Sequence, residues 1–384
     1  MLQKVPPGQS FKEVQGSDYD YLRSSARPVT GPWNRTVRTV DLFAGCGGTA
    51  LGVEEACSAL GMKSEIAWAI DFEPAACRVF RDNFPDANLV EGDVRSYFSG
   101  DVDGPITDDE KRLQQQVGPV NLLIGGPPCQ GHSDLNNFSR RSDEKNGLYL
   151  YMARAAKVFR PDHVLIENVQ GLPHDRSGVL DRTLSALKNE GYSVSHGLVD
   201  LVRLGVPQKR RRHIVLASRI GAVRTLDDVV CDAECEERDV AWAIADLIDR
   251  PASSIIDTPS NPSKDNRTRI DFLFENDLFD LPNEQRPPCH RDKQQTYTSI
   301  YGRLRWDRPS QTVTSGFYSM CMGRYVHPER RRTLTGHEAA RLQFFPDFFR
   351  FEGAGSRTAL AKIVGNAVPM KLSYALAREL LRER

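Results

Sequence analysis

Short apolar runs recur along the first half of the chain, separated by stretches with helical spacing. The clearest runs cover residues 39–43, 67–70, 120–124, 163–166 and 214–217. Apolar runs of this length, bounded by glycine or acidic residues, indicate buried strands, and their alternation with helices indicates βαβ units. The pattern therefore predicts an α/β fold with a Rossmann-like, mostly parallel, doubly wound sheet.

The pattern breaks after about residue 219. Proline, serine, asparagine and aspartate become frequent, and the run 251–269 predicts a loop. Near the end of the chain, the segment 363–369 predicts the opening of a helix that continues to about residue 382. The break indicates a second, smaller domain after the sheet domain.

The first 36 residues carry no clear periodicity and predict a loosely attached extension. Tyr19, Tyr21 and Trp33 are candidates for docking this extension on the body. The whole chain of 384 residues, 40% of them hydrophobic, is long enough for one sizeable core and a smaller lobe.

The formal net charge is zero, so composition does not indicate a generally basic surface. Positive charge is local instead, in clusters at 209–213, 303–308 and 330–332. Such clusters are either solvated faces or parts of a groove for nucleic acid. The eight cysteines have no regular spacing, and no signal peptide or long apolar span is evident, so we expect a reduced, cytosolic protein.

A zinc site is the alternative use of some cysteines. Cys231 and Cys235 are four residues apart, and Cys289 precedes His290. The first pair lies in an acidic stretch, and the distance between the pairs matches no common zinc motif. We therefore expect free cysteines and no metal.

The tetrapeptide Pro127-Pro128-Cys129-Gln130 makes one cysteine a candidate nucleophile. It follows the apolar run 120–124 and two glycines, which predicts a strand that ends in a tight loop. Prolines stiffen such a loop, and glycines let a ligand approach the backbone. An α/β enzyme places reacting groups at the mouth of a parallel strand. Alone, the segment also fits a small apolar residue in a loop.

A glycine-rich turn follows the first predicted strand. Residues 43–48 read Phe-Ala-Gly-Cys-Gly-Gly, and such glycines bring backbone N–H groups against a ligand at the start of a helix. Asp71 and Phe72 end the next strand, and Asp93 and Val94 follow a further apolar run. An acid at the end of the second strand suits the hydroxyls of a ribose. Because no P-loop lysine accompanies the glycines, the pattern indicates a nucleoside site.

Glu167 ends the apolar strand 163–166, and the basic cluster 208–213 leads into the strand 214–217. Buried acids are rare unless they are paired or used in chemistry. The alternative for Glu167 is a helix-capping acid.

In this order, these motifs resemble those of the cytosine-C5 DNA methyltransferases. The resemblance covers about residues 37–219 and 300–384, and the glycine turn is kept in full. One departure is Gly131-His132-Ser133, where the family often has a small residue, Phe and Ser. The resemblance implies the class I fold of methyltransferases that use S-adenosylmethionine, with a smaller target-recognition domain.

The resemblance also implies how the chain is organised. We expect an N-terminal extension at 1–36, a catalytic and cofactor-binding domain at 37–219, a target-recognition domain at 220–340, and a C-terminal segment at 341–384 that returns to the catalytic domain. The basic clusters bracket the least family-like part of the chain, which favours a groove that faces DNA.

The implied chemistry explains the catalytic residues. Cytosine C5 is a poor nucleophile, and addition of the Cys129 thiolate at C6 would give C5 carbanion character. Glu167 would hold a proton for N3. Arg212, with Arg210 beside it, would bind O2 and brace the site. Arg211 would point away on a strand and be solvated.

The implied methyl donor is S-adenosylmethionine, which becomes S-adenosylhomocysteine. Phe43, Gly45 and Gly47 would line its methionine end, and Asp71 would accept from the ribose hydroxyls. Phe72 would stack on the adenine, with core packing as its alternative. The cofactor-binding residues that we expect are Phe43, Ala44, Gly45, Gly47, Asp71, Phe72, Asp93, Val94, Pro128, Leu148, Asn366 and Ala367.

A target carbon inside a stacked duplex is unreachable, so the cytosine must be flipped out. The polar segment 131–147 follows the nucleophile and predicts a lid over the flipped base. The DNA-binding residues that we expect are Gln130, Ser133, Arg140, Arg141, Gln208 and Thr312.

The expected function is methyl transfer to C5 of a flipped-out cytosine in a specific double-stranded DNA sequence, through a covalent bond between Cys129 and C6. One alternative is a transfer-RNA cytosine, although the Cys-Phe-Thr signature of that branch is absent. The other is a catalytically silent DNA-binding paralogue, against which Cys129, Glu167 and Arg212 argue.

The expected setting is the bacterial cytosol or nucleoid, without a membrane. We expect a monomer whose partner is double-stranded DNA. A restriction endonuclease that acts on the same site is a candidate partner, and a solitary regulatory role is the alternative.

Overall fold

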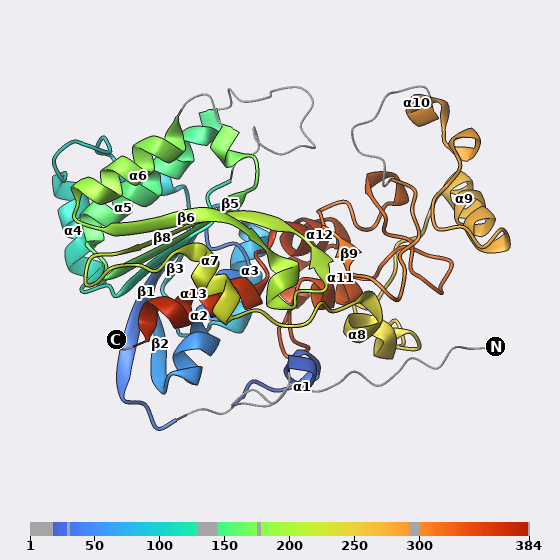
Figure 1. Ribbon diagram of the computed structural model, residues 1–384, viewed down its shortest axis with the longest axis horizontal. Coiled ribbons are helices and arrows are strands. Elements are labelled where there is room, and N and C mark those ends of the chain that lie inside the picture. Colours follow the sequence, from blue (N-terminus) through green and yellow to red (C-terminus); the bar gives the residue numbers. More distant parts are fainter. Residues whose placement is uncertain (1–17, 29–30, 129–143, 175–177, 292–299, 383–384) are drawn as a thin grey trace. The chain divides into compact units, whose positions relative to one another are not determined.

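The computed structural model describes residues 18–28, 31–128, 144–174, 178–291 and 300–382. Contacts divide the chain into two compact units (Figure 1). The sheet unit comprises Pro28–Leu204, Arg211–Cys235 and Val368–Arg384. The second unit comprises Met1–Arg27, Gly205–Arg210 and Glu236–Ala367. The domain boundaries drawn from the sequence stay a prediction.

A seven-stranded sheet with the strand order β3-β2-β1-β4-β5-β8-β6 forms the centre of the sheet unit. Its strands are β1 (Arg35–Leu42), β2 (Met62–Asp71), β3 (Leu89–Glu91), β4 (Leu122–Gly125), β5 (His163–Val169), β6 (Ser193–Asp200) and β8 (Arg211–Ser218). Strands β1 to β5 pair in parallel, and β8 runs antiparallel to both β5 and β6. The predicted α/β fold with a mostly parallel sheet is confirmed.

Helices cover both faces of this sheet, as a doubly wound fold requires. Figure 1 shows α4, α5 and α6 along one face and α2, α7 and α13 along the other. The helices of the sheet unit are α2 (Gly48–Ala59), α3 (Pro74–Asn83), α4 (Asp108–Val117), α5 (Leu150–Phe159), α6 (Val179–Asn189), α7 (Leu226–Asp232) and α13 (Met370–Leu381). Two short 3₁₀ turns of this unit are η1 (Val94–Ser96) and η3 (Glu144–Tyr149).

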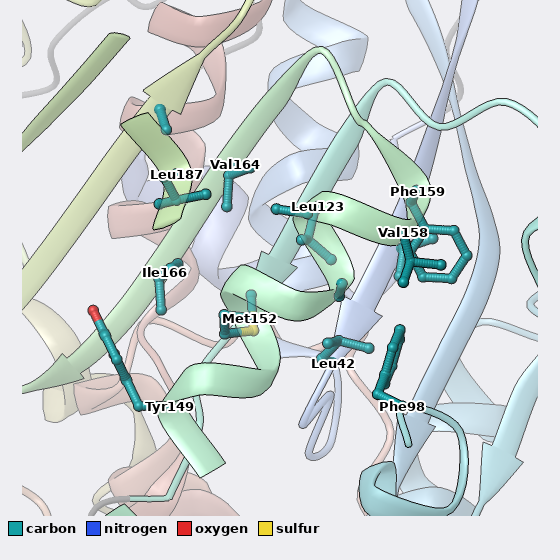
Figure 2. Close-up of a cluster of buried hydrophobic side chains, with 14 of the residues drawn as sticks. Leu42, Phe98, Leu123, Tyr149, Met152, Val158, Phe159, Val164, Ile166 and Leu187 are labelled. Atoms are coloured by element: carbon teal, nitrogen blue, oxygen red, sulfur yellow. The ribbon is translucent and has the colours of Figure 1, made fainter. Parts of the chain in front are cut away.

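The main hydrophobic core lies between the sheet and the first helix layer (Figure 2). Leu42, Leu123 and Ile166 from three neighbouring strands meet Met152 and Phe159 of α5, and all five side chains are buried. The continuous apolar runs of the sequence supply the strand side of this core, because both faces of a parallel sheet are covered.

The strand order reverses between β1 and β4, because β2 and β3 lie on one side of β1 and β5 lies beyond β4. An open α/β sheet binds ligands in the crevice outside the carboxyl ends of its strands at such a switch point. Leu42 pairs with Gly125 at this place. A Cβ atom on Gly125 would lie 2.5 Å from the Met152 sulfur, so only glycine lets β4 and α5 approach this closely.

The second unit contains short elements joined by long connections. They are α1 (Asp18–Arg23), β7 (Gln208–Lys209), α8 (Val240–Ile244), α9 (Lys264–Glu275), α10 (Pro288–Arg291), β9 (Ser310–Gln311), α11 (Gly336–Leu342) and α12 (Arg357–Asn366). The predicted loop over 251–269 is wrong at its end, because α9 begins at Lys264. The Ser263 hydroxyl accepts from the Asn266 N–H at 3.4 Å and caps this helix, and the helix buries Ile270 and Leu273.

A second correction concerns the C-terminal helix. Residues 363–366 end α12, and α13 starts only at Met370. Pro369 separates the two helices, because proline lacks the N–H that a continuing helix would need.

The N-terminal helix α1 is packed within the second unit. The Tyr21 ring meets Phe348 at a centroid distance of 5.7 Å, and Tyr19 meets Trp242 at 6.0 Å. These ring contacts agree with the predicted docking of Tyr21 and Tyr19, although Tyr19 remains 38% exposed and Trp33 is 39% exposed.

Candidate active site

Glu167 and Arg212 form an ion pair at the end of β5. The antiparallel register places Val169 opposite Arg212, so the two side chains meet across neighbouring strands. The Arg212 Nε lies 2.6 Å from Glu167 Oε1, and both side chains are 13% exposed. Burial lowers the pKa of Arg212 from its usual value, and the charge of Glu167 opposes that change. Glu167 is therefore a paired strand residue, and the helix-capping alternative is wrong.

The loop that follows β4 is anchored beside this pair. The Asn168 side-chain amide donates to the Pro127 carbonyl at 3.1 Å, and Asn168 is buried. A Cβ atom on Gly126 would lie 3.2 Å from Glu167 Oε2, so the loop backbone passes close to the carboxylate. Asn168 was missed in the sequence, although its place next to Glu167 at a strand end is a usable signal.

Cys129 comes two residues after Pro127 and lies outside the described residues, as do the predicted DNA contacts that follow it. These are Gln130, Ser133, Arg140 and Arg141. Of the predicted lid 131–147, the structure describes only residues 144–147.

Among the described cysteines, Cys46, Cys57 and Cys77 are buried. Burial raises the pKa of each of these thiols to about 12. Because the thiolate is the nucleophile, such groups are chemically inert near neutral pH.

Asp71 ties the glycine-rich turn to the end of β2. Its Oδ2 accepts from the Gly45 N–H at 2.8 Å, and its Oδ1 accepts from the Glu73 N–H at 2.8 Å. Gly47 has φ 94°, and a Cβ atom there would lie 2.3 Å from the Phe84 ring. Each carboxylate oxygen can accept more than one hydrogen bond, so Asp71 can still receive a hydroxyl.

A cavity of about 920 Å³ opens at the carboxyl ends of β1, β2 and β3. Its size suits a nucleoside-containing ligand. Phe72 is 62% exposed at its wall, which makes the core-packing alternative for this ring wrong. The predicted cofactor residues among its lining are Phe43, Asp71, Phe72, Asp93, Val94, Pro128 and Leu148.

The sequence missed a second part of the lining. These residues come from the turn after β3, from the connection to α4, and from helices α5 and α6. They include Gly92, Arg95, Gly100, Asp101, Val102, Asp103, Gly104, Tyr151, Arg154 and Arg182.

Asp93 presents a carboxylate at the wall. Its Oδ1 accepts from the Arg95 N–H at 2.9 Å, which caps η1. The Arg95 guanidinium lies 2.5 Å from Oδ2. The hydrogen bonds from Arg95 lower the pKa of Asp93, so this residue is an acceptor at neutral pH.

Asp41 lies behind the glycine turn and is buried. Burial raises its pKa well above the usual value, and the nearby charge of Asp71 adds to the effect. Among the described residues, Oδ2 of Asp41 has no hydrogen-bond partner. Asp41 therefore favours its neutral form.

Arg210 and Gln208 are interior residues of the second unit. Arg210 is 3% exposed, and its guanidinium donates to the carbonyls of Val313 at 3.0 Å and Ala367 at 3.1 Å. Gln208 is fully buried, accepts from the Val313 N–H and donates to the Leu342 carbonyl. The prediction that Gln208 contacts DNA is wrong for this structure, because its amide has no exposed surface. The Arg210 guanidinium thus binds backbone carbonyl groups in the interior and does not present its charge at a surface.

Of the remaining predicted residues, the structure gives hydrogen-bond or ion-pair partners for Thr312 and Arg211. The Thr312 hydroxyl donates to the Lys209 carbonyl at 2.6 Å. Arg211 is exposed and pairs with Asp200 at 3.3 Å, which confirms that it is solvated. Contacts of Ala44, Asn366 and Ala367 with a cofactor, and of Thr312 with DNA, stay predictions.

Within the described ranges, no group of three or more His, Cys, Asp or Glu side chains could hold a metal ion. Nor does any described helix have the length and apolar character needed to cross a membrane.

Residues 37–382 match the sequence model for C-5 cytosine-specific DNA methylases. The chain belongs to this family. It is 44% identical to the Type II methyltransferase M1.BsuMI of Bacillus subtilis, over 95% of this chain and 85% of that protein. It is 32% identical to the Type II methyltransferase M.Eco47II of Escherichia coli, over 97% of this chain and 84% of that protein. The protein is a DNA (cytosine-5-)-methyltransferase, as the motifs predicted.

Solved structures of similar fold agree with the predicted architecture. The S. pombe Dnmt2 methyltransferase superposes with a TM-score of 0.61 at 19% identity, over 89% of this chain and 97% of that one. The Entamoeba histolytica methyltransferase EhMeth superposes with a TM-score of 0.58 at 15% identity, over 91% and 99% of the two chains. At these identities the likeness concerns the fold, and it confirms the class I methyltransferase fold.

Replacing Glu167 by Gln keeps the shape of the side chain but removes its charge and its capacity to hand over a proton. We expect turnover to fall by at least ~100-fold, the usual scale for general acid–base catalysis. Affinity for S-adenosylhomocysteine should change little. Glu65→Gln is the matched control, because Glu65 also pairs with an arginine of a neighbouring strand, Arg38. Normal turnover of Glu167→Gln would make Glu167 a structural residue.

Replacing Asp71 by Ala removes the predicted acceptor for the ribose hydroxyls and the partner of the Gly45 N–H. Charge-assisted hydrogen bonds of this kind contribute about 1.5–3 kcal/mol, so cofactor affinity should fall ~10- to 150-fold in calorimetry with S-adenosylhomocysteine. DNA binding without cofactor should be unchanged. The control is Glu91→Ala, since Glu91 pairs in register with Asp71 on β3 but does not line the cavity. Equal affinities of the two variants would contradict the role of Asp71.

Proposed function

We propose that this protein transfers a methyl group from S-adenosylmethionine to C5 of a flipped-out cytosine in a specific duplex sequence, through a covalent bond between Cys129 Sγ and C6. The observation that carries the proposal is the Glu167–Arg212 pair, held 2.6 Å apart beside the loop that leads to Cys129. A cavity suited to a nucleoside opens in the same unit.

The cysteine has to supply electrons to the ring. A thiolate that adds to C6 breaks the aromaticity of cytosine and gives C5 the electron density needed to attack a methyl group. S-adenosylmethionine, when bound, supplies that methyl group on an activated sulfonium. Solvent water then takes the C5 proton, the electrons of that C–H bond expel the Cys129 thiolate from C6, and the proton on N3 returns to Glu167, which restores the ring and releases the enzyme.

Glu167 and Arg212 handle the charge that this addition pushes into the ring. When the base is bound, Glu167 takes up a proton from solvent and donates it to N3, and the guanidinium of Arg212 binds O2. The ion pair keeps both groups aligned before the base arrives, and alignment in a site sheltered from water strengthens each interaction. Asn168 contributes by holding the Pro127 carbonyl, which fixes the start of the nucleophile loop.

The cavity residues suit the cofactor in type and position. Asp71 accepts from the ribose hydroxyls, the exposed ring of Phe72 stacks on the adenine, and Asp93 accepts from the adenine amino group. The open space beside Gly45, where a Cβ atom would meet nothing within 4 Å, leaves room at the turn. Methyl transfer leaves S-adenosylhomocysteine in the same place, and the proposal needs no metal.

The proposed partner is double-stranded DNA, read by the target-recognition region at 220–340. The two bacterial relatives are named Type II methyltransferases, which supports a restriction-modification system with an endonuclease that acts on the same site. A monomer in the bacterial cytosol or nucleoid fits this role.

A trapped adduct tests the nucleophile. Wild-type protein should form a stable covalent complex with substrate DNA that carries 5-fluorocytosine, because fluorine cannot leave as a proton does. Cys129→Ser should form no adduct and should lose methyl transfer by several orders of magnitude while it keeps DNA affinity. Cys231→Ser is the control, since Cys231 is an exposed thiol of the same unit. A wild type that methylates this DNA but gives no adduct would argue against the covalent route.

Exchange of residues 221–306 with those of a related enzyme tests target recognition. The chimera should methylate the donor enzyme's sequence, because base contacts specify the target whereas phosphate contacts only position the protein. Its affinity for S-adenosylhomocysteine should match that of the parent. Methylation mapping of DNA from expressing cells gives the result, and an unchanged target site would place recognition elsewhere in the chain.

A further inference from the structure

One wall of the cavity is a segment without regular structure. Gly100, Asp101, Val102, Asp103 and Gly104 line the cavity between η1 and α4. Its own backbone supplies one turn hydrogen bond, from the Gly104 N–H to the Asp101 carbonyl at 3.0 Å. A wall of this kind keeps its shape only if side chains from elsewhere hold it.

Arg154 of α5 is the side chain that holds it. Nη1 donates to the carbonyls of Asp101 at 2.6 Å and Gly104 at 2.8 Å, and Nη2 donates to the carbonyl of Pro105 at 2.7 Å. Nε and Nη2 also donate to the two carboxylate oxygens of Glu110 at 2.9 and 2.5 Å. A guanidinium has five N–H groups in a fixed fork, and this set of partners uses them all.

Glu110 of α4 completes the clamp from the other end of the segment. Besides Arg154, it accepts from the Gly100 N–H at 3.2 Å and from the Thr107 N–H at 2.8 Å. Burial opposes its charged form, but the hydrogen bonds from Arg154, Thr107 and Gly100 lower its pKa to about 2. The carboxylate is therefore ionised and holds both ends of the wall.

This pair is completely interior. The Arg154 side chain is 2% exposed and that of Glu110 is 0% exposed. A buried ion pair costs desolvation, and well-packed apolar residues can often replace it without loss of stability. A gain in stability therefore does not explain why this ion pair is present. A need to hold the wall in one conformation explains it.

Gly100 fits the same requirement. A Cβ atom there would lie 2.0 Å from Nη2 of Arg154, so any side chain would push the guanidinium away from its partners. A small residue at this position leaves the space that the fork occupies.

We propose that Arg154 and Glu110 are positioning residues for the cofactor, which hold the wall from Gly100 to Pro105 in the shape that receives the nucleoside of S-adenosylmethionine. The inference rests on the cofactor site proposed above. Arg154 lines the cavity, but all its N–H groups donate to the wall and to Glu110. It therefore acts by holding the wall and not by contacting the ligand.

The expected effect follows from the population of the held conformation. If the wall adopts that conformation only a tenth of the time, the apparent affinity for the cofactor falls ~10-fold. The chemical step proceeds at Cys129, Glu167 and Arg212, so turnover at saturating cofactor should stay the same. KM for the cofactor should rise while kcat does not change.

Two variants test the proposal in the full-length protein. Arg154→Lys keeps the charge but cannot reproduce the five-donor fork, and Gly100→Ala keeps every charge while it displaces the fork. Calorimetry with S-adenosylhomocysteine should give a ~10-fold weaker affinity for both variants. Hydrogen exchange of residues 99–107 should become faster, and saturating S-adenosylhomocysteine should slow it again. Affinity for duplex DNA should be unchanged.

The matched control is Arg219→Lys. Arg219 also donates to backbone carbonyls, those of Arg160 and Pro161, and to the Asp162 carboxylate, but it does not line the cavity. It should leave cofactor affinity and exchange at 99–107 as in the wild type. If Arg154→Lys fails to fold, Gly100→Ala alone decides the question.

The outcomes separate this inference from the cofactor site on which it rests. Wild-type affinity in folded Gly100→Ala and Arg154→Lys, together with a weakened Asp71→Ala, overturns the positioning role and leaves the cofactor site in place. Wild-type affinity in all of these variants overturns both. A lower kcat with an unchanged KM would indicate a general structural role and would also overturn the inference.

Discussion

The parallel pairing of β1 with β4 is the constraint on which the rest of the site depends. Because the chain reverses direction across the sheet at this pair, the connections that follow the two strands leave the sheet in opposite directions and open a crevice. The glycine turn after β1 and the loop after β4 that leads to Cys129 therefore start at the same edge. Gly125 allows this arrangement, because a side chain there would collide with Leu42 and Met152.

Two ion pairs near that edge have different surroundings. The Glu167–Arg212 pair lies on β5 and β8, next to the start of the loop that leads to Cys129, and is partly sheltered from water. The Arg154–Glu110 pair is fully interior and is directed at a wall of the cavity. Both pairs are expensive to desolvate, and each lies beside a group whose position matters for the proposed chemistry.

Much of this was readable from the sequence because it depends on local pattern. Apolar runs between glycines identify strands of a covered parallel sheet, and a functional residue directly after such a run is carried to the sheet edge. Asp71, Phe72, Asp93 and Glu167 were placed in this way. Strand β6 was not foreseen, since its alternation of half-buried and exposed residues lacks a continuous apolar run. Helix α9 was not predicted, because its sequence is mostly polar. Only one serine cap, Ser263, and two buried apolar residues, Ile270 and Leu273, mark it as a helix.

The sequence by itself determined the chemistry at the strand ends: a glycine turn, carboxylates, a cysteine after two prolines, and an arginine cluster, all in one order. Only the tertiary structure decided which polar residues face a site and which hold backbone. Gln208 and Arg210 lie in the same cluster as Arg212, yet their side chains are buried against carbonyl groups. Arg154 is one arginine in an ordinary helix until folding brings distant carbonyls within reach of its N–H groups. The physical reason is that strand-end chemistry follows from local sequence, whereas hydrogen-bond partners that are distant in sequence exist only after the chain has packed.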